Sequence, residues 1–383
     1  MSGGTKEKGK GSGKALLDAF IASNGALSVF VVLLGFACGT LIIMAVGRNP
    51  GGMYLALLQT LTGYNATSQV WNSRYVGEWL TASMPLILTG MSMGFAARTG
   101  LFNIGAEGQY IVGLTAAQFV ALFFPPVVGL HWVIAVAAGG LAAAFWGGFV
   151  GWLRAKYAVS EVVATIMLNY IAFFLSRYLT RLIPDANTYR TPSYPETALI
   201  PRGFLDGLTN HSRLSLGIFL VLACVLVYWL VLERTKLGFE LRATGLNRNA
   251  ALYAGISVTR SFTTSMAIAG AFAGIAGAIV ALGSFSYGRV LGGYDNYGFN
   301  GIAVALVGNS RAGGTLVSGL LFGMLASAQP LMQSRQIPKE ITWIISGLVV
   351  VFVSLRAGFR LLVEWRAKVA AARGQASTGA DDA

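Results

Sequence analysis

Charged residues are scarce in this sequence. Only 11% of its 383 residues are Asp, Glu, Lys or Arg, while 55% are hydrophobic, and soluble domains carry about 25% charged residues. So little charge cannot cover the surface of a soluble protein, and we expect a chain that faces lipid. The 28 basic residues outnumber the 15 acidic ones. In a membrane protein this excess is typical of cytoplasmic loops, so it does not indicate a nucleic acid polymer as a partner.

Residues that bind metals or perform catalysis are also few. The two cysteines, Cys38 and Cys224, lie in apolar runs, and the two histidines have no neighbours at metal-site spacing. The chain contains no GxSxG motif and no paired carboxylates. The stretch GTKEKGKG resembles a phosphate loop but lacks Ser or Thr after Lys10. We therefore expect no catalytic residues, no metal and no cofactor bound by this chain, and no enzymatic activity.

Long hydrophobic runs are abundant. A bilayer core of about 30 Å needs roughly 20 apolar residues in a helix, and ten runs fit this description: 26–46, 79–97, 103–124, 130–153, 159–179, 214–232, 262–283, 298–309, 314–330 and 341–357. The eighth run is short, as a broken or re-entrant helix would be. Residues 51–62 are too short to cross and predict an interfacial helix. The fold class is therefore an all-α polytopic membrane bundle of about ten helices.

The distribution of charge predicts the orientation. Most of the Lys and Arg residues fall in cytoplasmic segments if both termini lie inside, which satisfies the positive-inside rule. The chain then divides into a cytoplasmic basic tail (1–25), a transmembrane domain (26–357) and a cytoplasmic C-terminal tail (358–383). A large inner loop (233–261) and a long outer loop (180–213) interrupt the membrane domain.

Five spans in each half would make the two halves inverted relative to one another. The third span opens with Phe102-Asn103-Ile104-Gly105 and the eighth with Phe299-Asn300-Gly301-Ile302. Interrupted segments at matching positions of two halves are typical of a transport site.

Polar residues inside apolar runs are candidates for function. The stretch GLFNIGAEGQYIVG places Asn103, Glu107 and Gln109 at the start of the third span, and Asn169 lies in the fifth. One interpretation is structural: Asn103 caps a helix, Glu107 lies in its first turns, and neighbouring helices pack closely on the glycines. The other is contact with a transported solute or a gate. Glu161 opens the fifth span and either caps that helix or, with Glu107, carries protons in an ion-coupled transporter.

The segment GSFSYGRVLGGYDNYGFNG joins the seventh and eighth runs on the outer side. Its aromatic rings can stack on sugars or bases, and its polar side chains can bind hydroxyl groups. An aromatic belt at the membrane interface explains the same pattern. The candidates for substrate contact here are Phe285, Tyr287, Asp295, Phe299 and Asn300.

The inner loop carries its own pattern. Leu237, Leu241 and Thr244, followed by small residues at helical spacing, predict a short amphipathic helix. A face of Ala and Gly allows another protein to approach closely, and Arg242 and Arg248 can form charge-assisted hydrogen bonds with it. The loop therefore has the features of a docking surface for a cytoplasmic partner protein.

Three stretches together resemble a known family. LG…RATGLNRNAALYAGI, PLILTGMSMGFAARTGLFNIGAEGQYIVG and GFNGIAVALVGNSRAGG are similar to the permease subunits of bacterial ATP-binding-cassette importers for branched-chain amino acids, ribose and nucleosides. The FNIGAEGQ form looks closest to the simple-sugar and nucleoside permeases. The resemblance covers about Asn49 to Leu355, nearly the whole membrane part.

The resemblance implies a multi-pass permease of the bacterial cytoplasmic (inner) membrane that imports nucleosides or related simple sugars. A separate ATP-binding subunit would bind ATP and Mg and drive alternating access. Further partners would be an extracytoplasmic substrate-binding protein and a second permease, unlike this chain rather than a second copy of it. By the match, the residues that couple to the ATPase are Arg242, Ala243, Gly245, Asn247, Ala250, Ala251 and Gly255.

Overall fold

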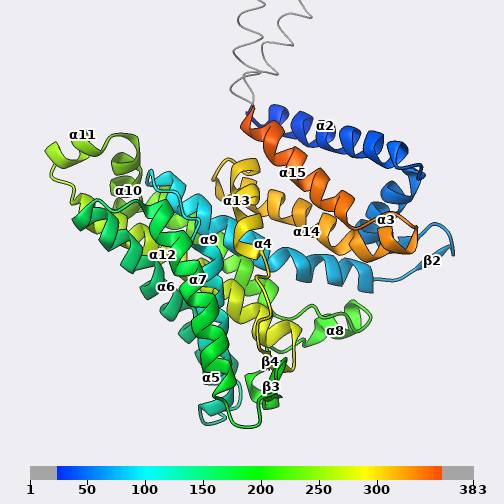
Figure 1. Ribbon diagram of the computed structural model, residues 1–383, viewed down its shortest axis with the longest axis horizontal. Helices are drawn as coiled ribbons and strands as arrows, with labels where there is room; N and C mark the ends of the chain where they lie inside the picture. The colour runs from blue at the N-terminus through cyan, green and yellow to red at the C-terminus, as the bar shows by residue number, and fades with distance from the viewer. Residues whose placement is uncertain (1–23, 356–383) are drawn as a thin grey trace, which may run out of the picture. The chain divides into compact units, whose positions relative to one another are not determined.

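The computed structural model describes residues 24–355, so the predicted C-terminal tail and all but the end of the predicted N-terminal tail lie outside the described residues. The chain forms two compact units. Of the described residues, the first unit comprises 24–50 and 340–355, and the second comprises Gly51–Lys339. Both units are built mainly of helices (Figure 1).

The first unit pairs two apolar helices, α2 (Asn24–Ala45) and α15 (Glu340–Ser354). They approach closely because α2 presents glycines to α15. A Cβ on Gly35 would lie 2.5 Å from Val349 Cγ2, and one on Gly39 would lie 2.5 Å from Ile345 Cγ1. Small residues at such a contact allow dense helix packing in a membrane.

The second unit contains most of the helices. They are α3 (Gly51–Thr62), α4 (Arg74–Arg98), α5 (Ala106–Phe123), α6 (His131–Tyr157), α7 (Glu161–Arg181), α8 (Phe204–Leu208), α9 (Gly217–Arg234), α10 (Lys236–Leu246), α11 (Arg248–Tyr253), α12 (Val258–Ile279), α13 (Tyr297–Val307) and α14 (Ala312–Ser334). Two short turns of other helix types are η1 (Glu196–Ala198) and the π-helical η2 (Val280–Ser284), which extends α12.

A helix lies in each of the ten apolar runs identified in the sequence. Among the described residues, six of them, α4, α6, α7, α9, α12 (with η2) and α14, are long and apolar enough to cross a membrane. α5, whose 18 residues include Glu107, Gln109 and Gln118, is not among them. In the most apolar 18 residues of α4, 83% are buried, whereas only 28% are buried in the same length of α9. α4 is therefore a central helix, and α9 lies at the periphery.

α12 is the other central helix, and it packs against α4, α5 and α6. A Cβ on Gly113 of α5 would overlap the backbone of Gly274 in α12, and one on Gly139 of α6 would lie 2.7 Å from the carbonyl oxygen of Gly113. Three helix backbones thus touch with no side chain between them. Beside this contact, Phe95 packs edge-on against Tyr228, with ring centroids 5.6 Å apart.

Two short antiparallel sheets join the helices. β1 (Tyr64–Asn65) pairs with β2 (Val70–Trp71) between α3 and α4. β3 (Arg190–Ser193), in the predicted long loop after α7, pairs with β4 (Tyr287–Arg289), which follows α12. α10 and α11 lie at one end of α6, α9 and α12, and β3 and β4 lie at the other end (Figure 1). We refer to these as the α10–α11 end and the β3–β4 end.

The short eighth run forms the short helix α13. Its 11 residues span only about 16 Å at 1.5 Å per residue, roughly half of a bilayer core. After β4 the chain turns back among the helices, and α13 begins beside the middle of α4, where Thr89 Oγ1 donates a hydrogen bond to the Tyr297 carbonyl (2.9 Å). The eighth run is therefore a short helix, as the sequence predicts.

Candidate functional site

The first turns of α5 and α13 meet inside the second unit, and a carboxylate lies between them. The backbone N–H groups of Asn296 and Gly298 donate to the two oxygens of Glu107, at 2.9 and 2.6 Å. A Cβ on Gly298 would overlap the backbone nitrogen of Glu107, so only glycine permits this approach. The N–H groups at the start of a helix have no partner within the helix and carry partial positive charge. Glu107 therefore caps α13 from a neighbouring helix.

Asn103 does not cap α5, contrary to the interpretation drawn from the sequence. The N-cap residue is Gly105, and no side chain caps that end. Instead, the Asn103 amide group donates to Gln109 Oε1 (2.9 Å) and Ser92 Oγ (3.0 Å), and Gln109 Nε2 donates back to Asn103 Oδ1 (3.2 Å). All three side chains are buried. They satisfy one another, because the segment before α5 is itself buried and offers no water.

Asn169 of α7 holds the same region from another side. Its Oδ1 accepts the Gly108 N–H (2.8 Å), and its Nδ2 donates to the Ile104 carbonyl (3.1 Å). A Cβ on Gly108 would lie 2.6 Å from Asn169 Oδ1. α7 therefore packs closely on this glycine, and the two hydrogen bonds fix α7 against the start of α5.

A half-buried ion pair joins the last residue of β4 to the segment before α13. Arg289 binds Asp295 through both terminal nitrogens, and the Tyr110 hydroxyl of α5 donates to Asp295 Oδ2 (2.8 Å). Burial disfavours the charge on Arg289, but the hydrogen bonds and charge of Asp295 outweigh this effect and raise the pKa of the guanidinium. Glu107 and Tyr110 lie one turn apart on α5, so one face of this helix holds both Asp295 and the start of α13.

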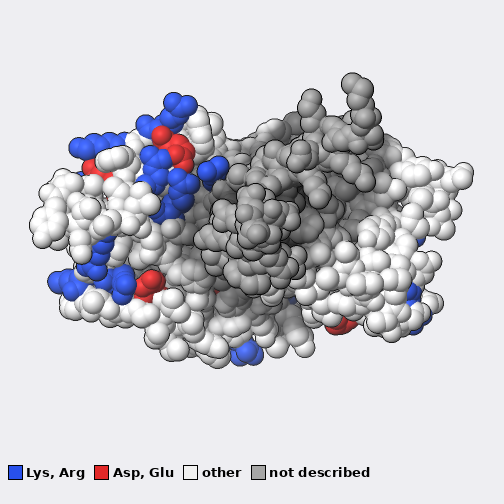
Figure 2. Space-filling view, turned by 90° about the horizontal axis from the view of Figure 1, so that it is seen from above, with Lys and Arg blue, Asp and Glu red and all other residues white. Residues whose placement is uncertain are grey.

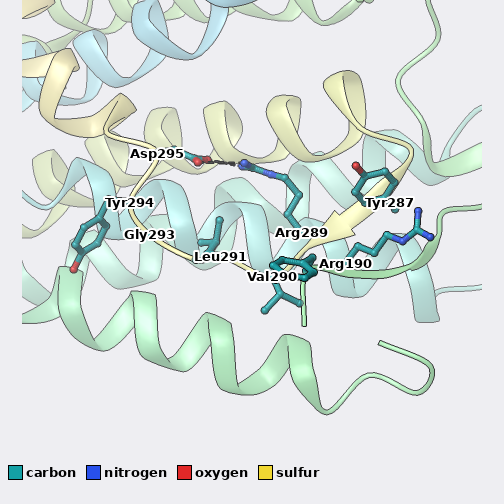
Figure 3. A pocket seen from close by; sticks show the side chains of 10 residues that line it. Arg190, Tyr287, Arg289, Val290, Leu291, Gly293, Tyr294 and Asp295 are labelled. Atoms are coloured by element: carbon teal, nitrogen blue, oxygen red, sulfur yellow. Dashed lines mark hydrogen bonds and ion pairs between the residues drawn. The ribbon is translucent and has the colours of Figure 1, made fainter. Parts of the chain in front are cut away.

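A cavity of about 330 Å³ opens beside this ion pair (Figure 3). Arg190 lies over the ring of Tyr287 at 5.6 Å, and Arg289 lies over that of Phe285 at 4.6 Å. Phe299 packs edge-on against Tyr294, with centroids 5.9 Å apart, and Asn300 is exposed.

The structure brings together the two groups of substrate-path candidates that the sequence left separate. Glu107 of the first group contacts the segment that carries Asp295, Phe299 and Asn300. Tyr287 is the first residue of β4, which precedes that segment, and Phe285 lies two residues before it.

The inner-loop pattern forms two helices, α10 and α11, rather than the single helix expected. The break is at Asn247, whose extended backbone ends α10 and whose side-chain oxygen accepts the Ala250 N–H (3.0 Å). Asn favours such caps over a helix interior, because its side chain competes for the backbone N–H groups. The helical spacing of the small residues continues across the break, which is why it resembled one helix.

The predicted coupling residues differ in exposure. Asn247, Ala250 and Gly255 are exposed, Ala251 is buried, and Arg242, Ala243 and Gly245 are half-buried. Arg242 pairs with Glu233, which also binds Arg98 of α4 (2.8 Å). Gly245 lies against the end of α4, where a Cβ would be 2.5 Å from the Arg98 carbonyl oxygen. The α10–α11 pair is therefore fastened directly to α4.

Sequence reasoning missed the most exposed side chains of this region. Leu246, Leu252 and Tyr253 are 89%, 62% and 93% exposed. Lys and Arg side chains, with a few acidic ones among them, gather over the α10–α11 end of the face shown in Figure 2. An apolar patch with a charged rim is typical of a protein interface. The interrupted helical pattern at Asn247 is the signal that identifies these residues as the tip of a turn.

Glu161 lies in the first turn of α7, where it forms an ion pair with Arg154 of α6 (3.1 Å). It is far along the chain from the cluster around Glu107, and no hydrogen bond or ion pair of the described residues joins the two carboxylates.

Comparison with known proteins identifies the family. Residues 75–354 match the model of the family described as the branched-chain amino acid transport system permease component. The chain belongs to this permease family. The permease is 38% identical to the guanosine ABC transporter permease NupP of Bacillus subtilis, over 88% of its own length and 94% of that protein. It is 33% identical to the nucleoside ABC transporter permease NupB of Lactococcus lactis subsp. cremoris, with coverage of 86% and 90%.

A third relative, the glucose ABC transporter permease TsgB13 of Haloferax volcanii, is 31% identical, with coverage of 85% and 86%. No solved structure matches the permease. The permease is thus a multi-pass membrane protein and a transport component rather than an enzyme, as expected from the sequence. Its family implies ATPase and substrate-binding partners, and the ion-coupled alternative based on Glu107 and Glu161 is not supported.

Proposed function

We propose that the permease imports nucleosides in an importer powered by a separate ATP-binding subunit. The observation that carries this proposal is the 38% identity, over nearly the full length of both chains, to a permease named for guanosine. A second candidate substrate class is simple sugars, which the similarity to a glucose permease favours. ATP and Mg would be bound by the partner subunit, and an extracytoplasmic binding protein would deliver the substrate.

The α10–α11 pair would be the surface on which the ATPase docks. One residue separates α10 from the end of α9, and four residues separate α11 from the start of α12. Gly245 lies against the end of α4. Of the two central helices, α4 therefore ends at this surface and α12 begins close to it. A push by the ATPase on α10 and α11 would reach the segment between β4 and α13 through α12, and the start of α13 through α4.

The orientation proposed for the permease has both termini in the cytoplasm, with about ten spans in two inverted halves. The α10–α11 end would then face the cytoplasm, and the β3–β4 end would face outward. This arrangement places the basic rim of Figure 2 on the cytoplasmic side, which satisfies the positive-inside rule. The membrane would be the bacterial inner membrane, and the second permease subunit would be unlike this chain.

The test of function is uptake by the complete importer reconstituted in liposomes with its ATPase, second permease and binding protein. We expect uptake of radiolabelled guanosine that depends on internal ATP and persists when the proton gradient is collapsed. Uptake that continues without ATP and stops with the proton gradient would contradict the proposal. Glucose and ribose, assayed in parallel, identify the substrate class.

The docking surface has its own test. Tyr253→Arg places a bulky charge in the exposed apolar patch, so we expect the ATPase to be lost from the purified complex while membrane insertion is normal. The matched control is Tyr189→Arg, because Tyr189 is 81% exposed but lies beside β3, at the other end of α9. Retention of the ATPase by Tyr253→Arg would show that it docks elsewhere.

A further inference from the structure

A larger cavity, of about 540 Å³, is lined in part by Tyr297, the first residue of α13. Its walls come from the first turns of α4, the second half of α14 and the segment before α9. The lining residues used below are Tyr75, Glu78, Arg213, Tyr297, Ala326 and Pro330. None of them belongs to the substrate path expected from the sequence. The volume falls within the range of about 300–1,000 Å³ that is usual for small-molecule sites.

Glu78 and Arg213 supply fixed polar groups to one wall. Arg213 donates to Glu78 from its side chain, at 2.9 and 2.6 Å, and from its backbone N–H, at 3.1 Å. The Arg213 side chain nevertheless remains 54% exposed, whereas that of Glu78 is 19% exposed. The pair therefore holds its geometry and still offers guanidinium donors, and a carboxylate oxygen has lone pairs for a further donor. A hydroxyl group can bind such a pair, because it both donates and accepts.

A proline supplies a backbone acceptor on the opposite wall. Pro330 lies inside α14 and has no N–H, so the carbonyl of Ala326, four residues earlier, cannot receive its usual helical hydrogen bond. Both residues line the cavity. A carbonyl freed in this way accepts a hydrogen bond from a ligand hydroxyl at no expense to the helix.

Tyr75 and Tyr297 add two aromatic rings to the lining. Rings of this kind pack against the flat or apolar face of a sugar or base. Tyr297 is the first residue of α13, and its neighbours Asn296 and Gly298 are the residues that Glu107 binds. One side of the cavity is therefore attached to the segment that a push through α4 would move.

The smaller cavity near β4 is less suited to a neutral ligand. In its ion pair with Asp295, the Arg289 side chain is only 22% exposed, against 54% for Arg213 in the larger cavity, so Arg289 has less room to donate to a ligand. The larger cavity instead combines acceptors, donors and rings that remain available.

We propose that the cavity between α4, α14 and the start of α13 is a transit site that binds a neutral, polyhydroxylated ring compound during import. This inference rests on the proposed function. The shared chemistry is a ring with adjacent hydroxyl groups, which occurs both in the ribose of a nucleoside and in a free sugar.

The experiment fills the cavity in the complete reconstituted importer. Ala326 is an exposed residue of the lining, so Ala326→Trp occupies the cavity without replacing a core side chain. Ala137→Trp is the matched control, because it makes the same change at an exposed position of α6 that does not line the cavity. Uptake of labelled guanosine, ribose and glucose is measured together with the ATPase activity stimulated by the binding protein.

We expect Ala326→Trp to lower uptake at least tenfold while the stimulated ATPase activity stays within twofold of wild type. Ala137→Trp should transport within twofold of wild type. The compound that wild type carries identifies the ligand as a nucleoside or a free sugar.

Uptake by Ala326→Trp within twofold of wild type, or an equal loss in Ala137→Trp, would overturn the transit site while leaving the proposed function intact. If the wild-type importer carries none of the three compounds with ATP, the proposed function itself fails, and the transit site fails with it.

Discussion

Replacing Glu107 with Gln tests whether the carboxylate is structural or meets cargo. In the structure its two oxygens each accept one backbone N–H of α13, at 2.9 and 2.6 Å. Gln keeps one oxygen and puts an NH₂ group opposite the other N–H, so one buried donor loses its acceptor. A hydrogen bond to a charged group is worth about 1.5–3 kcal/mol, and a buried donor left unsatisfied costs about 1–3 kcal/mol. We therefore expect Glu107→Gln to destabilise the permease by about 2–3 kcal/mol.

The assay combines thermal inactivation of the purified importer with uptake in liposomes. Glu107→Gln should assemble normally, inactivate at a lower temperature and keep most of its uptake, whereas Glu107→Ala, which removes both acceptors, should be about twice as destabilising. Glu161→Gln is the matched control, because this carboxylate pairs with a partly exposed arginine and should change stability by less than about 1 kcal/mol.

One result would refute the structural role of Glu107. If Glu107→Gln assembles normally and is as stable as wild type but transports nothing, then the carboxylate contacts the cargo or carries a proton. Equal destabilisation in Glu161→Gln would also count against the reasoning, because no backbone N–H of a neighbouring helix binds that side chain in the described chain.

Two further predictions concern the same region. Gly298→Ala should abolish folded, assembled permease in detergent extracts, because its Cβ would overlap the backbone of Glu107. Gly293→Ala should be tolerated, because nothing lies within 4 Å of the new Cβ. A normal yield of Gly298→Ala would show that α5 and α13 do not touch. Asp295→Asn should lower thermal stability by about 1–3 kcal/mol, because Arg289 and the Tyr110 hydroxyl lose a charged acceptor. Asp206→Asn, in an exposed pair, should cost less than about 1 kcal/mol. Equal melting temperatures of the two variants would contradict the importance of the Arg289–Asp295 ion pair.

The positions of the helices could be read from the sequence because hydrophobic length is a local property. Each apolar run of the described chain contains a helix, since a chain in lipid must satisfy its backbone hydrogen bonds within the segment itself. Breaks in the pattern were equally local. The two prolines after Phe124 follow the end of α5, and the short eighth run is the short α13. The family was also readable, because three separated motifs occur in the same order.

The partners of the polar side chains were decided only by the tertiary structure. Glu107 binds N–H groups 189 and 191 residues away, and no periodicity in the sequence connects these positions. The role of Asn103 was misread for the same reason: its side chain could cap α5 or bind Gln109, and only the buried position of the segment before α5 selects the second. At Asn247 two local preferences competed, and the cap ended the helix that the spacing of small residues would have continued.

The sequence alone therefore determined that this chain lies in a membrane, where its helices occur and to which transport family it belongs, because these follow from composition, run length and local motifs. Only the tertiary structure decided what each buried polar group binds. It also decided that one cavity draws its walls from α4, α13, α14 and the segment before α9, because such a site depends on helix packing between residues far apart in the chain.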